Sequence, residues 1–123
     1  EEVAAEIKAR NPHSKTIAIK TDVTNDVEVT AMVDEVVKKL GDLTIACNNA
    51  GIAQWIDSED MPYSDFQKMM RVNLDSVFLC AQAEARYMFK KGYGKIISNK
   101  WENIVLVTEI FFKVNLQIIK YFV

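Results

Sequence analysis

Histidine, cysteine, proline and glycine are all scarce in this sequence. Among 123 residues there are one His, two Cys, two Pro and four Gly. One histidine and two cysteines without a CxxC spacing do not supply the ligands of a standard zinc site, so we exclude metal chemistry as the function. Cys47 and Cys80 each lie in an apolar run. We therefore expect two reduced, buried thiols in a cytoplasmic protein.

An excess of basic residues is also missing. Fifteen Lys and Arg face 17 Asp and Glu, which gives a formal net charge of −2 and a pI near 5.4. A protein that binds nucleic acid through a basic surface has the opposite balance, so we exclude that class. Half of the residues are hydrophobic, which argues against a disordered chain.

The hydrophobic pattern alternates between helix-like and strand-like segments. Helix patterns cover residues 1–10, 25–40 and 64–91, and strand patterns cover residues 16–20, 43–47 and 95–98. The run at 43–47 is apolar throughout, as expected for a strand covered on both faces. Strands that alternate with helices of this length predict part of a doubly wound, Rossmann-type α/β fold with a parallel sheet. In that class a ligand binds outside the carboxyl ends of the strands.

Short-range signals predict where the helices begin and end. Asn25 with Glu28 has the spacing of a capping box, and Ser64 with Gln67 has it again. Gly41 is suited to the position that follows the second helix. The long helix at 64–91 carries apolar residues on two sides, so we expect one side to pack on the sheet and the other on a second subunit.

Polar residues follow two of the predicted strands. Asp22, in Asp22-Val23-Thr24, offers an acceptor for an exocyclic amine or a ribose hydroxyl, although it also suits a turn or a helix cap. In Asn48-Asn49-Ala50-Gly51, the small residues would let a flat ligand approach the main chain, or they mark an ordinary turn. Asn73, within the long helix, either perturbs the helical hydrogen bonds or lies on the surface.

Together these motifs resemble the short-chain dehydrogenases/reductases. The DVT at 22–24, the NNAG at 48–51 and the RVNLDSVF at 71–78 have that family's order and spacing, and the resemblance covers residues 1–98. Residues 58–97 look most like the fungal branch of NADP-dependent mannitol dehydrogenases and sorbose reductases. The resemblance implies an oxidoreductase that moves a hydride between NAD or NADP, with NADP slightly favoured, and an alcohol or carbonyl compound such as a sugar or polyol.

The resemblance also implies roles for single residues. Asp22 with the Val23 main chain would contact the adenine ring, and the adenosine ribose would be lined by Asn48, Asn49, Ala50 and Gly51. Asn73 would match the catalytic asparagine, where a local helix kink lets a main-chain carbonyl hold a water of a proton relay. The helix at 64–91 would pack against its copy in a homo-oligomer. Neither nucleic acid nor a membrane is expected as a partner.

Two motifs of that family are not found where they are expected. The glycines, at positions 41, 51, 92 and 94, form no TGxxxGxG turn of the kind that holds a pyrophosphate. The catalytic Ser and the YxxxK pair of the family come after the strand at 95–98. Tyr87 and Lys91 have the YxxxK spacing but end the long helix, so we interpret them as a surface pair. We predict a partial NAD(P)-binding domain at 1–98, without the first strand, Gly-rich turn and second strand, and inactive alone.

Residues 99–123 differ in composition from the rest of the chain. They contain no Gly, Ala, Pro or Asp, and 14 of these 25 residues are Phe, Ile, Lys, Asn or Tyr. Because such residues have AT-rich codons, we interpret the tail as read-through into non-coding sequence or as a mispredicted exon. Charges such as Glu109 and Lys113 cost about 2.5–3.5 kcal/mol each inside a bilayer, which disfavours a membrane span. An added strand or amphipathic helix over exposed sheet fits better.

Two further hypotheses stay open. The chain could be a non-catalytic interaction module that pairs through the 64–91 helix, or a remnant without function. In the doubly wound strand order, two missing strands separate the strand at 16–20 from the strand at 43–47, so these two could not pair directly. Unpaired edges and uncovered helix faces favour aggregation, and we predict a poorly soluble or partly molten chain.

Overall fold

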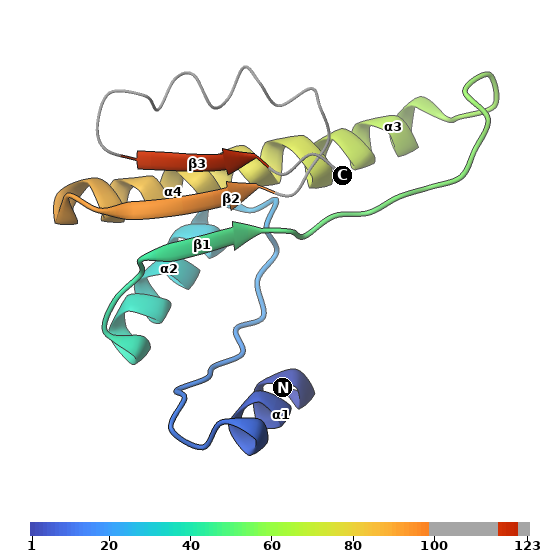
Figure 1. The fold of residues 1–123 in the computed structure, drawn as a ribbon. Helices are drawn as coiled ribbons and strands as arrows, with labels where there is room; N and C mark the ends of the chain where they lie inside the picture. The colour runs from blue at the N-terminus through green and yellow to red at the C-terminus, as the bar shows by residue number, and fades with distance from the viewer. Residues whose placement is uncertain (99–115, 121–123) are drawn as a thin grey trace.

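The computed structural model describes residues 1–98 and 116–120, and its elements alternate as the sequence predicts (Figure 1). The helices are α1 (Glu2–Arg10), α2 (Asp26–Leu40), α3 (Tyr63–Met70) and α4 (Ser76–Lys91), with the π-helix η1 (Arg71–Asp75) between the last two. The strands are β1 (Ile45–Asn48), β2 (Gly94–Ser98) and β3 (Leu116–Lys120). This order is that of a partial α/β domain.

The three strands form one parallel sheet in the order β1-β2-β3. Ala46 lies opposite Ile96, and Ile96 lies opposite Ile118. Helices α2 and α4 lie on the same side of the sheet (Figure 1). The core between α4 and the sheet consists of Ala46, Ala81, Ala85, Met88 and Ile96. The parallel pairing and the helical crossover between β1 and β2 confirm the predicted fold class.

A glycine sets the distance between β2 and α4. A Cβ atom added at Gly94 would overlap the Met88 side chain and would lie 2.7 Å from the Cβ of Met88. Met88 is 1% exposed, so it has no open space into which it can withdraw. The close packing of this strand on this helix therefore requires a residue without a side chain at position 94.

The predicted ends of α2 are confirmed. Asn25 Oδ1 accepts hydrogen bonds from the main-chain N–H groups of Val27 and Glu28, at 3.1 and 3.3 Å. Asn25 Nδ2 also donates to Glu28 Oε1 at 3.3 Å. The main-chain N–H of Asn25 donates to the carbonyl of Asp22, so the cap is present but the reciprocal bond of the predicted capping box is missing. Gly41 follows the helix with φ +93°, and Gly92 follows α4 with φ +77°. Both are left-handed conformations that favour glycine.

The capping box predicted at Ser64 and Gln67 is wrong. Helix α3 begins one residue earlier, at Tyr63, and no side chain caps it. Pro62 precedes the helix with φ −60°, and its carbonyl accepts the N–H of Phe66 at 3.1 Å. Pro62 is thus the residue before the helix, with an extended ψ of 138°, and Ser64 already lies in the first turn rather than at the cap.

The strand predicted at residues 16–20 is also wrong. This segment follows α1 as an extended stretch without a sheet partner among the described residues. A strand needs a neighbouring strand to satisfy its backbone groups, and no described strand lies beside this one. The hydroxyl of Thr16 instead donates to the carbonyl of Ala4, at 3.1 Å.

Strand β1 is covered on one face, which corrects the expectation of burial on both. Ala46 is buried, whereas Ile45 is 60% exposed and Cys47 is exposed. The helices α2 and α4 cover one side, and no described helix packs on the other (Figure 1). The expectation of two buried thiols therefore holds for Cys80 and fails for Cys47, and both cysteines are free.

The described part of the tail is strand β3. Its pairing with β2 agrees with the interpretation of the tail as an added strand. Residues 99–115 and 121–123, with most of the predicted tail, lie outside the described residues. Within the described part of the chain, no helix has the length and hydrophobicity needed to span a bilayer.

Candidate functional site

The NNAG segment begins at the carboxyl end of β1. Asn48 is the last residue of that strand and lies opposite Ser98 of β2. Asn49, Ala50 and Gly51 continue beyond the strand and are exposed. The NNAG segment therefore lies at the sheet edge where parallel α/β folds bind ligands, with small residues that leave the main chain accessible. The alternative of an ordinary turn is wrong, because the chain runs on from β1 as a loop without a turn (Figure 1).

Asn73 contacts this segment through the residue that comes directly after it. Its Oδ1 atom accepts the main-chain N–H of Ile52 at 2.9 Å, and its Nδ2 atom donates to the carbonyl of Ile52 at 2.8 Å. The side chain of Asn73 thus pairs with both polar groups of one peptide residue. Of the alternatives left open by the sequence, a surface position is excluded, because Asn73 is partly buried against this main chain.

The long helix is not the continuous α-helix that the sequence pattern suggested. It changes to a π-helix over η1, and Asn73 is the middle residue of that π-helix. The hydroxyl of Ser76 donates to the carbonyl of Val72 at 2.6 Å. A π-helix breaks the regular i→i−4 ladder, so the predicted perturbation at Asn73 is present as a local change of helix type.

Asp22 forms a turn with Thr24. Its Oδ1 atom accepts the main-chain N–H of Thr24 at 2.9 Å and the Thr24 hydroxyl at 2.8 Å. These two hydrogen bonds lower the pKa of Asp22 below its ordinary value. The bond from the Thr24 main chain has the larger effect, and the bond from the Thr24 hydroxyl has the smaller one. Its N–H donates to Glu28 Oε2 at 2.8 Å, which fixes the DVT segment to the first turn of α2. The turn interpretation of Asp22 is therefore correct, and a ligand role would come in addition to it.

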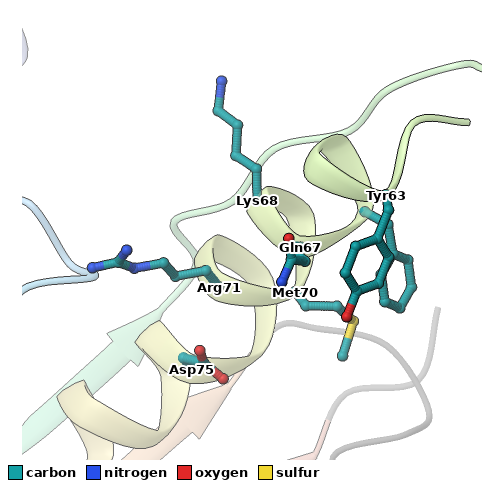
Figure 2. A pocket seen from close by; sticks show the side chains of 7 residues that line it. Tyr63, Gln67, Lys68, Met70, Arg71 and Asp75 are labelled. Atoms are coloured by element: carbon teal, nitrogen blue, oxygen red, sulfur yellow. The ribbon is translucent and has the colours of Figure 1, made fainter.

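Arg71, the first residue of η1, acts on the DVT segment electrostatically. Its positive charge is the smallest of the causes that shift the pKa of Asp22, and it lowers that pKa. Figure 2 shows the Arg71 side chain extending from the helix toward the segment that precedes α2. Asn48 ends β1 and Asn73 binds the chain just after it, so both lie at the carboxyl end of that strand.

Glu84 is a residue of this region that the sequence analysis did not identify. It lies on α4, is 4% exposed, and accepts a hydrogen bond from Asn48 Nδ2 at 3.0 Å. Burial raises the pKa of Glu84 to about 7, and the Asn48 hydrogen bond opposes this only in part. The sequence contained one signal for it. Glu84 is an acidic residue at a position of α4 that faces the core, between Ala81 and Ala85, where a charged group needs a partner.

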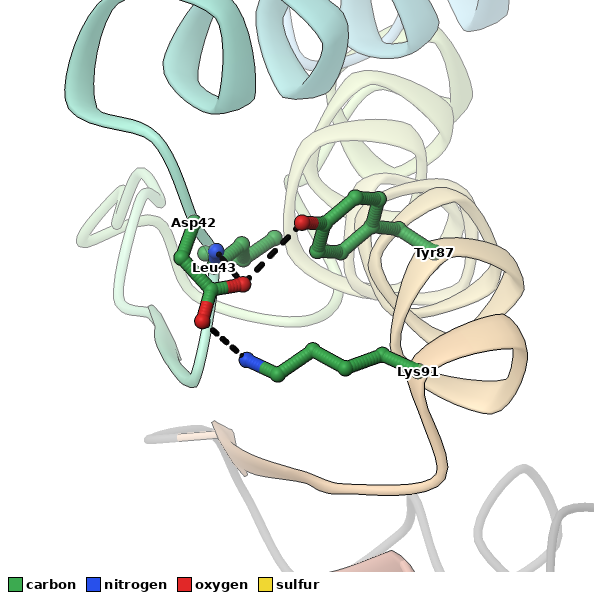
Figure 3. A network of polar contacts seen from close by, with 4 residues as sticks. All are labelled: Asp42, Leu43, Tyr87 and Lys91. Atoms are coloured by element: carbon green, nitrogen blue, oxygen red, sulfur yellow. Dashed lines mark hydrogen bonds and ion pairs between the residues drawn. The ribbon is translucent and has the colours of Figure 1, made fainter.

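The Tyr87–Lys91 pair gathers around Asp42 (Figure 3). Tyr87 donates its hydroxyl proton to Asp42 Oδ1 at 3.0 Å, and Lys91 forms an ion pair with Asp42 Oδ2. Asp42 precedes β1, so this cluster lies at the amino end of the strand. The hydrogen bond to Asp42 raises the pKa of Tyr87, which is opposite to what a tyrosine base requires. The cluster joins the loop after α2 to the end of α4.

A groove of about 580 Å³ runs along the outer surface of α3 and η1 (Figure 2). The rings of Tyr63 and Phe66 stack there, with centroids 6.1 Å apart. Tyr63 is 71% exposed, Phe66 45% and Met70 39%. The polar side chains along the groove are Gln67, Lys68, Arg71 and Asp75. Of the apolar residues that the sequence pattern placed on this helix, Phe66 and Met70 lie in the groove, among mostly polar side chains.

Comparison with known proteins identifies the family. The family model described as short chain dehydrogenase matches residues 1–99. The chain belongs to the short-chain dehydrogenase family. An NAD-dependent glycerol dehydrogenase from Listeria innocua serovar 6a is 37% identical over 97 residues, which are 79% of this chain and 37% of that protein. The chain therefore spans well under half of the length of this relative.

Solved structures of the family have the same fold. A short-chain type dehydrogenase/reductase from Mycobacterium marinum is 39% identical, with a TM-score of 0.75 over 80% of this chain and 39% of that one. Sorbitol-6-phosphate 2-dehydrogenase from Erwinia amylovora is 26% identical, with a TM-score of 0.75 and the same two coverages. These neighbours confirm the Rossmann-type class and an oxidoreductase family. The mannitol dehydrogenase and sorbose reductase branch stays a prediction.

The residues at the carboxyl end of β1 fit a nucleotide cofactor of the kind that this family binds. Ala50 and Gly51 are exposed and carry no long side chain. The Asp22 carboxylate, in the segment before α2, can accept a hydrogen bond from an amine or a hydroxyl group. Within residues 1–98 and 116–120, no group of three or more His, Cys, Asp and Glu side chains could hold a metal ion.

Proposed function

We propose that this chain is the central part of an NAD(P)-dependent oxidoreductase. The reaction is hydride transfer between the nicotinamide and an alcohol or carbonyl substrate. The observation that carries the proposal is the double hydrogen bond between Asn73 and Ile52. It joins the NNAG segment and the RVNLDSVF segment, two motifs of the family, at the carboxyl end of the sheet.

Each site residue has a proposed role that its contacts support. Asp22 and the main chain of Val23 bind the adenine ring, and the adenosine ribose lies against residues 48–51. Asn73 holds the main chain of Ile52, and the π-helix around it provides the main-chain carbonyl for the water of a proton relay. The bound cofactor supplies the hydride chemistry, and these residues bind and orient its adenosine half.

A sugar or polyol is the proposed substrate class. Its support is the likeness to a glycerol dehydrogenase and a sorbitol-6-phosphate dehydrogenase, both named for polyol substrates. NADP is slightly favoured by the resemblance to the mannitol dehydrogenase branch, whereas the glycerol dehydrogenase is named as NAD-dependent. The parent enzyme would be a cytoplasmic homo-oligomer.

We propose further that the 123-residue chain does not turn over substrate by itself. Its sequence contains no TGxxxGxG turn, and no Ser with a YxxxK pair follows β2. Tyr87 and Lys91 cannot replace that pair, because they are bound to Asp42 at the amino end of β1. Residues 1–98 would form the partial nucleotide domain, and residues 99–123 a tail outside the family.

Binding of adenosine monophosphate (AMP) to the full chain tests the nucleotide proposal. Saturation-transfer NMR should show transfer to the adenine protons of AMP, and the Asp22→Ala variant should reduce it severalfold. Arg86→Ala is the matched control, because Arg86 is exposed on α4. Absence of any AMP signal would refute the nucleotide role. Oxidation of NADPH by the chain with a ketose would refute the proposed inactivity.

A second candidate function is pairing through the helix at residues 64–91. The observation that favours it is the groove with exposed Tyr63, Phe66 and Met70 (Figure 2). Exposed aromatic and Met side chains are typical of protein interfaces. Light scattering should detect a dimer, and Phe66→Asp should dissociate it, whereas Lys68→Asp should weaken it less. A monomer at every concentration would contradict this function.

A further inference from the structure

Glu84 is an acidic residue that lies buried in the core. In the described part of the chain, Glu84 and Ser76 are the buried polar residues, and Glu84 is the charged one. Its neighbours on the same face of α4 are Ala81, Ala85 and Met88, which form the core against the sheet. A carboxylate in such surroundings costs free energy unless a hydrogen bond compensates for the lost water.

The partner that compensates for burial is Asn48. Its side-chain amide donates to Glu84 Oε2 at 3.0 Å, across 36 positions of sequence. No ion pair involves Glu84 among the described residues. Cys80 lies four positions before Glu84 on α4. Burial, and then the charge of Glu84, raise the pKa of Cys80 to about 11. Cys80 thus stays a neutral thiol, and Asn48 is what orients the carboxylate.

This bond fixes one end of the NNAG segment, and Asn73 fixes the other. Asn48 begins the segment and is held by Glu84, whereas Ile52 follows the segment and is held by Asn73. Both holding residues belong to the continuous helix formed by η1 and α4. They are 11 positions apart, or about three helical turns. The exposed residues between the two anchors are Asn49, Ala50 and Gly51.

We propose that Glu84 is a positioning residue for the cofactor site, which acts through Asn48 to hold the NNAG segment at a fixed place on the sheet edge. This inference rests on the proposed nucleotide role of the segment. The bond needs an acceptor oxygen at position 84, whether charged or neutral. That acceptor restricts the segment from one side while Asn73 restricts it from the other.

Limited proteolysis with subtilisin tests the proposal, because the protease cleaves exposed segments in proportion to their local mobility. In the full chain, Glu84→Ala should accelerate cleavage within residues 48–53 by about tenfold. Asn48→Ala should do the same, since it removes the other partner of the bond. Glu84→Gln keeps an acceptor in the same place and should cleave at the rate of the unmodified chain. The control Arg86→Ala changes an exposed residue of the same helix and should have no effect.

Two results would overturn the proposal. One is an unchanged cleavage rate of residues 48–53 in Glu84→Ala. The other is an equal acceleration at α2 and at the NNAG segment, which would mean a general loosening of the core. AMP binding separates this proposal from the nucleotide role. Faster cleavage of a segment that does not bind AMP leaves the positioning role intact and removes its link to a cofactor.

Discussion

Asn73 binds both main-chain groups of Ile52, with its amide oxygen 2.9 Å from the Ile52 nitrogen and its amide nitrogen 2.8 Å from the Ile52 oxygen. The two residues are 21 positions apart, and one is in a π-helix while the other is in a loop. A side-chain amide can pair in this way because it carries a donor and an acceptor in one plane. The loop after β1 is thereby fixed to the middle of the long helix.

Replacement of Asn73 by Leu should destabilise the fold by about 1–3 kcal/mol. The change leaves the N–H and the carbonyl of Ile52 without these partners in a partly buried place, and an unsatisfied buried group costs roughly this amount. Urea denaturation followed by circular dichroism measures the effect. Gln67→Leu, an exposed position on α3, is the control and should change the stability by less than about 0.5 kcal/mol. Equal effects of the two substitutions would contradict the role of the Asn73 bonds.

Glu84 should make the stability depend on pH. Its pKa is about 7 in the folded chain, above the ordinary value of 4.5 that we expect in the unfolded chain. The folded state therefore binds the proton more tightly, so this contribution to stability is complete below pH 4.5 and is lost as the pH rises to 7. The loss amounts to about 3 kcal/mol.

Glu84→Gln isolates that contribution. The variant has no proton to lose, so its free energy of unfolding should lack the decline between pH 4.5 and 7. Urea denaturation at several pH values measures the free energy of unfolding of both proteins. Relative to the unmodified chain, the variant should become more stable as the pH rises through this range. A difference that stays constant with pH would show that the Glu84 pKa is not raised.

Gly94→Ala should destabilise the packing of β2 on α4 by about 1–3 kcal/mol, the usual range for an overpacked core. The new methyl group would overlap the buried Met88 side chain. The double variant Gly94→Ala with Met88→Ala should be more stable than the two single effects predict, because the shorter side chain removes the overlap. Thermal melts of the four proteins give the coupling. Simple additivity of the two substitutions would argue against the close contact.

Asn25→Ala should lower the stability by about 1 kcal/mol, because Asn25 accepts two main-chain N–H groups at the start of α2. Asn25→Asp keeps the accepting oxygen and should retain most of the stability. Circular dichroism follows the loss of helix with increasing denaturant. The midpoint should be lower in Asn25→Ala than in the unmodified chain, and nearly unchanged in Asn25→Asp. Identical midpoints for Ala and Asp would contradict the capping role.

The helices could be predicted because their signals are local. The spacing of apolar residues in α2, the Asn25 cap and the terminal glycine Gly41 each act within a few residues, so one sequence reveals them. The start of α3 was predicted less well, because Ser64 has the chemistry of a cap while the helix begins directly after Pro62. The NNAG segment follows β1, as its place after an apolar run predicted, but it forms no turn.

The remaining features depend on contacts between distant parts of the chain. Residues 16–20 alternate as a strand does, yet a strand forms only beside a neighbour. Cys47 is exposed because no described helix covers its side of the sheet, which an apolar run does not reveal. Glu84 was missed because its partner Asn48 lies 36 positions away, and a lone acid among apolar residues normally faces solvent.

The π-helix has a geometric consequence for the whole of α3. One residue inserted into an α-helix rotates the preceding turns by about 100° around the axis relative to the turns after the insertion. The aromatic groove of α3 and the buried stripe of α4 owe their relative direction to this rotation. Deletion of a single residue within η1 would restore regular winding, swing Tyr63 and Phe66 to another side of the cylinder, and carry Asn73 away from Ile52.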